Sequence, residues 1–314
     1  MKVYLLIPFL AICLSCKGQS TVTKPIDLDV TIEESLNYLS GDALLGRDTG
    51  SEGIELAAQY MEGKFQEWGV KPYFETYRDT FDAKGKNGFN IVGVVEGHDD
   101  MLKNEVVILG AHYDHIGKGR MVENDSIANG ANDNASGTSI VLAMAEHFAK
   151  TKSNKRTLLF VLFSAEEMGL LGSAHIAERL KEKNINLYTM VNFEMLGVPF
   201  KDRDYEVFLT GFEMSNMAEK MNAYAGSNLV GFSEVSKQYS LFKRSDNYAF
   251  YKAFNLPCHT ISSCDLSNFD YYHHVDDEVD KLDVSFMKSV TKKLIPVIES
   301  VSNTATKEIT LNEE

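Results

Sequence analysis

Short runs of consecutive apolar residues alternate with helix-patterned segments along most of the chain, and this alternation limits the possible folds more than any other feature. Several of the runs are apolar on both faces, as strands of a sheet covered by helices on both sides must be. The predicted strands are Asn90–Val95, Val106–Gly110, Leu158–Phe163, Tyr188–Phe193, Glu206–Leu209 and Cys258–Ile261. The predicted helices are Ile54–Trp68, Ser136–Lys150, Gly172–Glu182, Glu213–Ala225, Asp246–Phe254 and Val284–Val301. The pattern predicts a single α/β domain whose twisted, mostly parallel central sheet carries helices on both faces.

The first residues of the chain differ from the rest. Lys2 is followed by an almost wholly apolar stretch, Val3–Ser15, of 13 residues. A bilayer span needs about 20 residues, so this stretch fits the apolar part of a signal peptide, with a buried first strand as the alternative. Leu14-Ser15-Cys16 resembles the cleavage box of bacterial lipoproteins, although Cys13 stands where Leu is usual. We expect an exported protein, periplasmic or outer-membrane and lipidated on Cys16, with plain secretion as the alternative.

The remaining chain reads as one folded unit with polar ends. Thr31 and Glu34 match a capping box, which predicts a helix from Thr31 to Leu39. The predicted division is a signal peptide at 1–15, a tether at 16–30, a single folded domain at 31–303 and a polar tail at 304–314, which we expect to fray.

The charge of the chain limits its partners. The sequence holds 45 acidic and 31 basic residues, a net charge of −14. Such a surface repels nucleic acid and anionic lipid, so neither is expected as a partner. Membrane contact is expected only through a lipid on Cys16.

Two cysteines remain in the predicted domain, Cys258 and Cys264. An exported protein folds in an oxidising compartment, where a small disulfide loop between them is plausible. Two buried free thiols are the equal alternative.

Polar clusters directly follow three of the predicted strands. They are His112-Tyr113-Asp114 after Val106–Gly110, Glu166-Glu167 after Leu158–Phe163, and Glu194 after Tyr188–Phe193. The carboxyl ends of strands in an open parallel sheet share one edge, where ligands bind. We therefore expect these clusters, far apart in sequence, to meet in space.

Two further clusters lie outside the strands. Residues Gly130–Gly137 are small or polar, and Asp133 is the only charged residue among them. Small side chains allow a loop to approach other groups closely. The other cluster, Tyr271–Asp277, contains His273 and His274.

The side chains in these clusters are imidazoles and carboxylates without thiolates, which suits a catalytic zinc better than a structural one. Taken singly, each cluster has a plainer interpretation: Glu166-Glu167 fits a helix start, and His273 fits a surface histidine. Their occurrence together favours a metal site. Glu166 and Glu167 could then divide two tasks, one binding the metal and the other accepting a proton.

Four segments of the chain resemble the co-catalytic zinc aminopeptidases, metallopeptidase family 28. They are Ala111-His-Tyr-Asp-His115, Gly130-Ala-Asn-Asp-Asn-Ala-Ser-Gly137, Phe163-Ser-Ala-Glu-Glu-Met-Gly-Leu170 and a closing segment from Tyr272 to Asp283. The resemblance begins near Leu45-Gly46-Arg47 and covers most of the predicted domain. The four segments occur in the order and at the spacing of the family.

The resemblance implies two zinc ions per chain and assigns a role to each matching residue. Asp133 would bridge the two ions, with His112 and Glu194 completing one site and Glu167 and His273 completing the other. Glu166 would be the general base. Asp114 would accept a hydrogen bond from His112, and Tyr272 would polarise the substrate carbonyl.

The sequence departs from the family pattern at three positions, one of which is a predicted ligand. Glu194 stands where Asp is usual; its extra methylene shifts the carboxylate outward, which would weaken zinc binding at the second site or change how zinc is shared, and Glu194 stays a predicted ligand. Asn247 replaces a frequent His in Arg244-Ser-Asp-Asn247, and we assign it no metal role. His274 replaces a common Thr, and His115 is expected to be a loop residue without a role.

The resemblance implies removal of amino-terminal residues from peptides, and the sequence leaves other functions open. A glutaminyl cyclase, an acyl-transfer enzyme of the same fold with one zinc, is the first alternative. A carboxypeptidase or dipeptidase is the second, and a Lys or Arg facing the site, such as Lys243 or Arg244, would favour it by binding a carboxylate. A non-enzymatic binding protein is the third, although the ligands and the base are all present.

Overall fold

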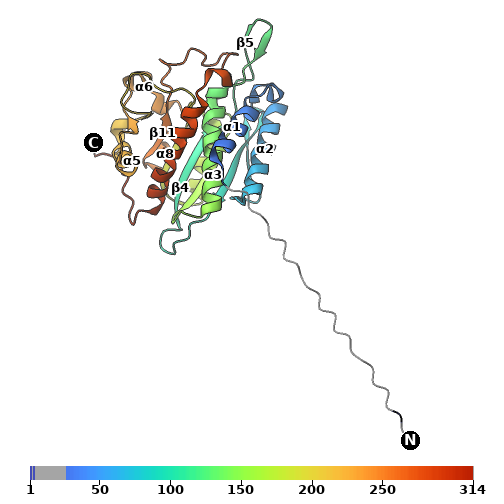
Figure 1. Cartoon of the computed structure of the whole chain (residues 1–314), viewed down its shortest axis with the longest axis vertical. Helices are drawn as coiled ribbons and strands as arrows, with labels where there is room; N and C mark the ends of the chain where they lie inside the picture. The colour runs from blue at the N-terminus through green and yellow to red at the C-terminus, as the bar shows by residue number, and fades with distance from the viewer. Residues whose placement is uncertain (2, 4–25, 314) are drawn as a thin grey trace.

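The computed structural model describes residues 26–313 together with residues 1 and 3 (Figure 1). The predicted signal peptide, apart from residues 1 and 3, and the predicted lipidation site Cys16 lie outside the described residues and stay predictions. Among the described residues, no helix is both long and apolar enough to cross a membrane.

The centre of the fold is a mixed β-sheet of nine strands, counted over the described residues. These strands are β1 (Lys71–Pro72), β2 (Arg78–Ala83), β3 (Lys86–Val95), β4 (Glu105–His112), β7 (Thr157–Phe163), β8 (Asn186–Phe193), β9 (Val207–Leu209), β10 (Val230–Gly231) and β11 (Cys258–Ser262). Their order is β1-β3-β7-β4-β8-β11-β9-β10, with β2 beside β3. The central strands β7, β4, β8 and β11 are parallel, whereas β3 and β9 pair antiparallel with this centre.

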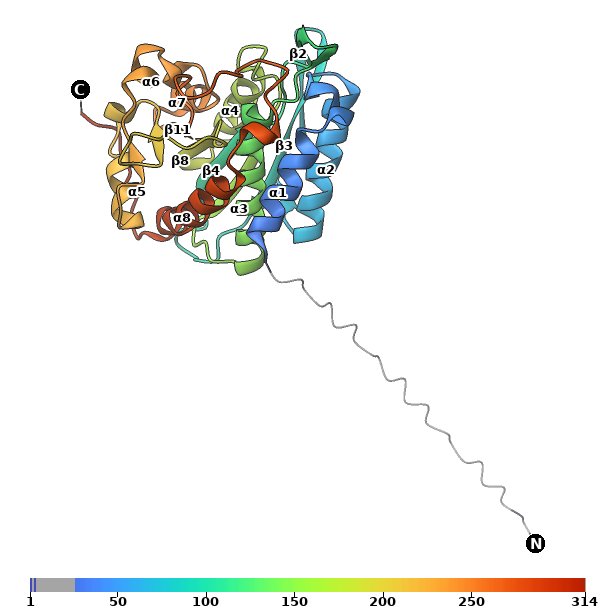
Figure 2. The same ribbon diagram turned by 45° about the horizontal axis from the view of Figure 1, so that its top comes forward.

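Helices cover both faces of the sheet, which confirms the predicted single α/β domain (Figure 2). One face carries α1 (Leu28–Leu39), α2 (Glu52–Trp68), α3 (Gly137–Thr151) and α8 (Val284–Asn303). The other carries α4 (Leu171–Glu182) and α7 (Asn247–Phe254). Helix α5 (Met217–Ala225) packs against α8, and the short α6 (Glu234–Gln238) packs against the helical turn η4 (Leu241–Lys243). The hairpin of β5 (Lys118–Val122) and β6 (Asp125–Ile127) forms a separate sheet.

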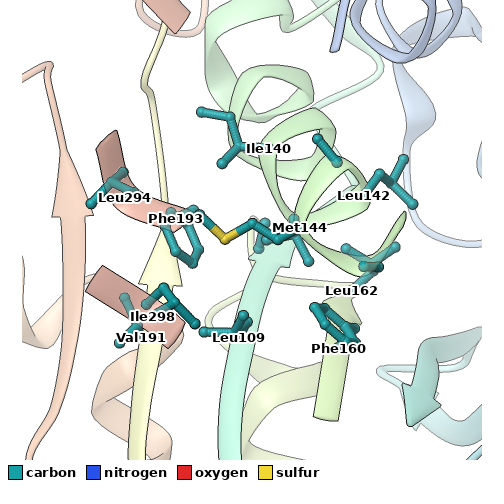
Figure 3. Packing of buried hydrophobic residues seen from close by; sticks show 14 of the residues in the cluster. Leu109, Ile140, Leu142, Met144, Phe160, Leu162, Val191, Phe193, Leu294 and Ile298 are labelled. Atoms are coloured by element: carbon teal, nitrogen blue, oxygen red, sulfur yellow. The ribbon is translucent and has the colours of Figure 1, made fainter. Parts of the chain in front are cut away.

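Successive residues of the central strands enter different cores, one on each side of the sheet. In β4, Val107 and Leu109 pack on the α3 side, whereas Val106 and Ile108 pack on the α4 side. Figure 3 shows Leu109 in the first core, together with Met144 and other apolar side chains. This two-sided burial is the physical reason for the uninterrupted apolar runs in the sequence.

The first helix begins earlier than its sequence pattern predicts. Helix α1 starts at Leu28, and its cap is Asp27, whose side chain accepts a hydrogen bond from the Val30 N–H at 3.3 Å. The predicted cap, Thr31, is buried and donates its hydroxyl to Glu146 of α3. The capping-box start at Thr31 is therefore wrong, because a tertiary contact uses that side chain.

The polar tail is packed against the domain, and the expectation that it frays is wrong. Ile309 is buried, and its N–H donates to the Tyr188 hydroxyl at 2.9 Å. The Thr310 N–H donates to the Asn216 side chain at 2.8 Å, and Leu311 forms an antiparallel bridge with Ser215.

The two cysteines of the domain are both buried and free. This matches the alternative of two free thiols, and no disulfide joins Cys258 to Cys264.

Candidate active site

The sheet brings the three predicted strand-end clusters together. Strands β7, β4 and β8 are adjacent and parallel, so their carboxyl ends share one edge. His112, the last residue of β4, lies in register with Phe163, the last residue of β7. Glu194 directly follows the end of β8. The convergence predicted from the strand order is thus present in the fold.

The loop that carries Asp133 is fixed to the end of β8 by side-chain amides. Asn134 donates to the carbonyl of Phe193 at 3.0 Å, and Asn132 accepts the Gly197 N–H at 2.9 Å. A Cβ atom on Gly137 would lie 2.2 Å from the Phe193 carbonyl oxygen. The small residues of this loop are therefore needed for its close contact with the strand.

Asp133 lies between two histidines from distant parts of the chain. Its Oδ1 is 3.3 Å from His112 Nε2, and its Oδ2 is 3.4 Å from His273 Nε2. Each carboxylate oxygen thus faces a different imidazole, which is the arrangement a carboxylate needs to bridge two cations.

Glu167 lies beside Asp133 and is held by two histidines. Its Oε2 is 3.0 Å from His273 Nε2, and its Oε1 is 2.9 Å from His115 Nδ1. His115, Asp133 and Glu167 offer ligand atoms that all lie within 4.8 Å of one another, close enough to hold a metal ion. His115 lies in a loop, as expected. It is nevertheless buried within this cluster, where it contacts Glu167.

The adjacent Glu166 differs from Glu167 in its contacts. Among the described residues, no side chain donates a hydrogen bond to the Glu166 carboxylate, whereas Glu167 contacts His115 and His273. The turn between β7 and α4 produces this difference, with Ala165 in the left-handed region at φ 58°. The two neighbouring acids are therefore in different environments, as the proposed division of tasks requires.

Asp114 contacts the turn that carries Glu166 and Glu167. Its carboxylate accepts the Glu166 N–H at 3.1 Å and the Glu167 N–H at 3.4 Å. Its Oδ1 is 3.8 Å from His112 Nδ1, too far for a hydrogen bond, and that nitrogen instead faces the Asp114 backbone carbonyl at 3.2 Å. The predicted carboxylate–histidine bond is corrected accordingly, because the backbone N–H groups engage the carboxylate.

Glu194 lies at the end of β8, where its carboxylate accepts hydrogen bonds from Ser245 and, at 3.4 Å, from Asn192. These two hydrogen bonds fix the carboxylate of Glu194, the residue that stands where the family usually has Asp. Asn247, by contrast, donates to the carbonyls of Phe242 and Cys258 and is a structural residue.

Tyr272 flanks the cluster from the solvent side. Its ring stacks on the His273 ring with centroids 3.9 Å apart, and 39% of its surface is exposed. His273 itself has φ 57°, a strained value for a residue other than glycine. The loop thus holds a histidine and a tyrosine together at the open side of the site. The Nδ1 of His274 accepts the Asp276 N–H at 3.1 Å and lies 3.5 Å from the Asp276 carboxylate, so its contacts are within the loop.

Burial disfavours the charged form of several acidic groups in the site and so raises their pKa values. Burial raises the pKa of Asp114 and of Glu194 to about 7, and it raises the pKa of Glu166 well above its usual range. Although burial opposes the charge on His273, Asp133 and Glu167 raise its pKa to about 10. A divalent cation bound here would favour the carboxylate forms, so these groups would lose their protons to solvent when it binds.

The donor atoms fit a metal ion. Nε2 of His112, His115 and His273 is buried, and none of the three makes a hydrogen bond within the described part of the chain, although Nε2 of His112 and of His273 lies 3.0–3.4 Å from the carboxylates of Asp133 and Glu167. Buried polar atoms normally have partners, so these three nitrogens require an explanation. A metal would satisfy His112 and His273 together with the carboxylates of Asp133, Glu167 and Glu194, the set predicted from the sequence.

Two residues without a predicted role hold the loops of the site in place through hydrogen bonds to their backbone. Arg47 is fully buried and donates to the carbonyls of Tyr113, Asn129 and Gly130 at 2.8, 2.6 and 3.0 Å. Asp277 accepts the N–H groups of Asn132 and Asp133 at 2.8 and 3.0 Å. Both residues lie within segments that resemble the family, and this resemblance is the feature of the sequence from which a role for them could have been predicted.

His115 gives a prediction about metal affinity. The hydrogen bond between His115 and Glu167 orients a predicted metal ligand, and loss of such an outer contact typically costs about 10- to 100-fold in affinity. His115→Ala is expected to lower zinc affinity by that factor, and His115→Gln, which keeps a donor, by less. Competition with a zinc-binding dye measures this. His147→Ala, on α3, serves as the control, and equal affinities for His115→Ala and the control would refute the orienting role.

The sequence matches a family model and several known proteins. Residues 90–298 match the model of Peptidase family M28. The chain is 28% identical over 185 residues to a probable zinc metalloprotease of Pyrenophora tritici-repentis, covering 54% of this chain and 41% of that protein. It is 29% identical over 148 residues to aminopeptidase YwaD of Bacillus subtilis, covering 47% of this chain and 30% of that protein. The chain therefore aligns with 41% or less of the length of these two relatives.

Solved structures share the fold at lower sequence identity. The LapA aminopeptidase of Legionella pneumophila superposes with a TM-score of 0.67 at 22% identity, covering 88% of this chain and 73% of that chain. A glutaminyl cyclase of Fimbriiglobus ruber superposes with a TM-score of 0.68 at 18% identity, covering 88% of this chain and 96% of that chain. The same architecture therefore occurs in an aminopeptidase and in a glutaminyl cyclase, and the fold alone does not choose between these activities.

Proposed function

Because the chain belongs to peptidase family M28, we propose that it is a zinc-dependent aminopeptidase that removes residues from the amino end of peptides. The names of the relatives support this proposal, since they include an aminopeptidase and a zinc metalloprotease. The buried cluster of imidazoles and carboxylates supports it independently, because this donor set suits a catalytic zinc.

We assign the predicted ligands to two zinc ions. Asp133 would bridge them, since its two oxygens face His112 and His273 separately. His112 and Glu194 would complete one site, and Glu167 and His273 the other. When bound, the zinc ions supply Lewis-acid chemistry, which makes a water molecule more acidic and polarises a carbonyl group.

The other side chains of the site would move the protons. Glu166 takes a proton from the water molecule as the water oxygen attacks the scissile carbonyl carbon. Glu166 then donates this proton to the amide nitrogen as the carbon–nitrogen bond breaks, which gives a free amine and a carboxyl product. Tyr272, at the open side of the site, would donate a hydrogen bond to the carbonyl oxygen as negative charge develops on it. Asp114 would hold Glu166 in place through the backbone N–H.

A single observation carries this proposal: Glu167 contacts two histidines, while the neighbouring Glu166 carboxylate contacts no donor among the described side chains. A hydrolase of this kind needs one carboxylate to bind metal and a second that stays free to accept a proton. The site supplies both from consecutive residues.

Digestion of a peptide library, read by mass spectrometry with zinc measured on the same sample, tests the proposal. The expected result is stepwise loss of amino-terminal residues and two zinc ions per chain. Loss of residues from the carboxyl end would support a carboxypeptidase instead. Pyroglutamate formation with one zinc per chain would support a glutaminyl cyclase, and an inert protein with zinc bound would exclude all three enzymes.

A further inference from the structure

A pocket opens directly beside the candidate active site. Glu194 and Tyr272, both from the site, line part of it, and Met195, Phe208 and Leu241 contribute an apolar wall. A substrate held against the site would therefore place one of its groups in this pocket. The lining residues then determine which substrates fit.

Arg244 lines this pocket, whereas its neighbour Lys243 does not. Lys243 lines a different cavity, together with Phe212 and Phe232. The backbone turn between η4 (Leu241–Lys243) and α7 thus places two adjacent basic side chains in separate pockets. Of the two basic residues singled out in the sequence, only Arg244 faces the site.

The charge of Arg244 is not neutralised by the protein. Arg244 is exposed and, within residues 26–313, its guanidinium has no hydrogen-bond or ion-pair partner. Most other arginines of the chain have partners: Arg47 with backbone carbonyls, Arg78 with Glu55 and Glu62, Arg156 with Glu105, Arg179 with Asp79 and Arg203 with Asp265. In a chain with a net charge of −14, a cation left free beside the site is available for a ligand.

We infer that Arg244 selects peptides that place a carboxylate in this pocket, an inference that rests on the proposed function. A guanidinium binds a carboxylate through two parallel hydrogen bonds, which adds both strength and orientation. The apolar wall suits the methylene groups that precede the carboxylate. The Glu194 carboxylate also lines the pocket; it accepts a hydrogen bond from Ser245, and the zinc assigned to it above would offset its negative charge. Arg244 also repels lysine and arginine side chains from the same space.

The carboxylate could come from two parts of a peptide. One source is the side chain of a first-residue glutamate or aspartate, and the other is the free carboxyl end of a dipeptide. Arg244 would bind both carboxylates in the same way. Substrates that carry only one of the two carboxylates therefore show which source is recognised.

Two ratios of kcat/KM, measured on the zinc-loaded full chain, test the inference. The first compares glutamyl-anilide with leucyl-anilide, and the second compares leucyl-glycine with leucyl-glycinamide. We expect the carboxylate substrate to be favoured in one of the two pairs, and Arg244→Gln to lower that ratio by about tenfold or more. Arg244→Glu should lower it further and favour lysyl-anilide. Lys243→Gln is the matched control and should leave the ratio unchanged.

The outcomes separate the inference from the function on which it rests. Equal ratios in the wild type and Arg244→Gln, with leucyl-anilide still cleaved, would overturn the inference and leave the aminopeptidase proposal standing. A change of the same size in Lys243→Gln would also overturn it, since the effect would then be general electrostatics. Wild-type protein that carries zinc and cleaves none of the substrates would refute the proposed function itself.

Discussion

Glu166→Gln is expected to lower kcat by about 10² to 10⁴, because the amide cannot accept the proton that the attacking water must lose. The substitution keeps the size and hydrogen-bonding shape of the side chain. Zinc content should stay at the wild-type value, since Glu167, and not Glu166, contacts the histidines of the site. Steady-state rates on leucyl-anilide, with zinc measured on the same samples, check both parts.

A surface substitution of the same chemistry provides the control for this experiment. Glu178→Gln, on the exposed side of α4, should leave the rate and the zinc content unchanged. A rate for Glu166→Gln within a factor of three of the wild type would exclude Glu166 as the base. Loss of zinc together with activity would instead assign Glu166 to the metal.

Asp133→Asn is expected to remove most of the bound zinc and nearly all activity. The change removes the negative charge that faces both His112 and His273. Outer contacts to a metal site already contribute about 10- to 100-fold to affinity, so loss of a bridging ligand should cost more than about 100-fold. Zinc content after dialysis and the zinc dissociation constant measure the effect.

Asp100→Asn, an exposed position in the loop before β4, is the matched control for the loss of one acidic charge. It should bind zinc as the wild type does. Retention of full zinc occupancy by Asp133→Asn would contradict the bridging role. Thermal unfolding of both variants without zinc shows whether the loop fold survives, because the Asn132 and Asn134 contacts remain in place.

The parts of the fold that the sequence predicts are those governed by local pattern. The central strands β4, β7 and β8 are buried on both faces, and their apolar runs locate them within two residues. The hairpin β5–β6 is polar and largely exposed, so no apolar pattern marks it. The start of α5 was predicted four residues too early, because Ser215 is extended and interrupts the helix at a point where the sequence shows no breaker.

In the candidate site, too, some features follow from local sequence pattern and others depend on tertiary contacts. The convergence of His112, Glu166 and Glu194 follows from strand order, which the pattern supplies. The contact between His115 and Glu167, by contrast, depends on which way two loop side chains turn. His112 Nδ1 faces a backbone carbonyl, and the identity of the residues does not reveal which backbone group a side chain will face. Tertiary contacts of this kind need coordinates.

Anomalous diffraction from a crystal soaked in zinc tests the central claim most directly. The account predicts two peaks about 3.5–4 Å apart, one on each side of the Asp133 carboxylate, with no peak coordinated by Glu166. A map with no peak near Asp133, or with the zinc bound by Glu166, would contradict it.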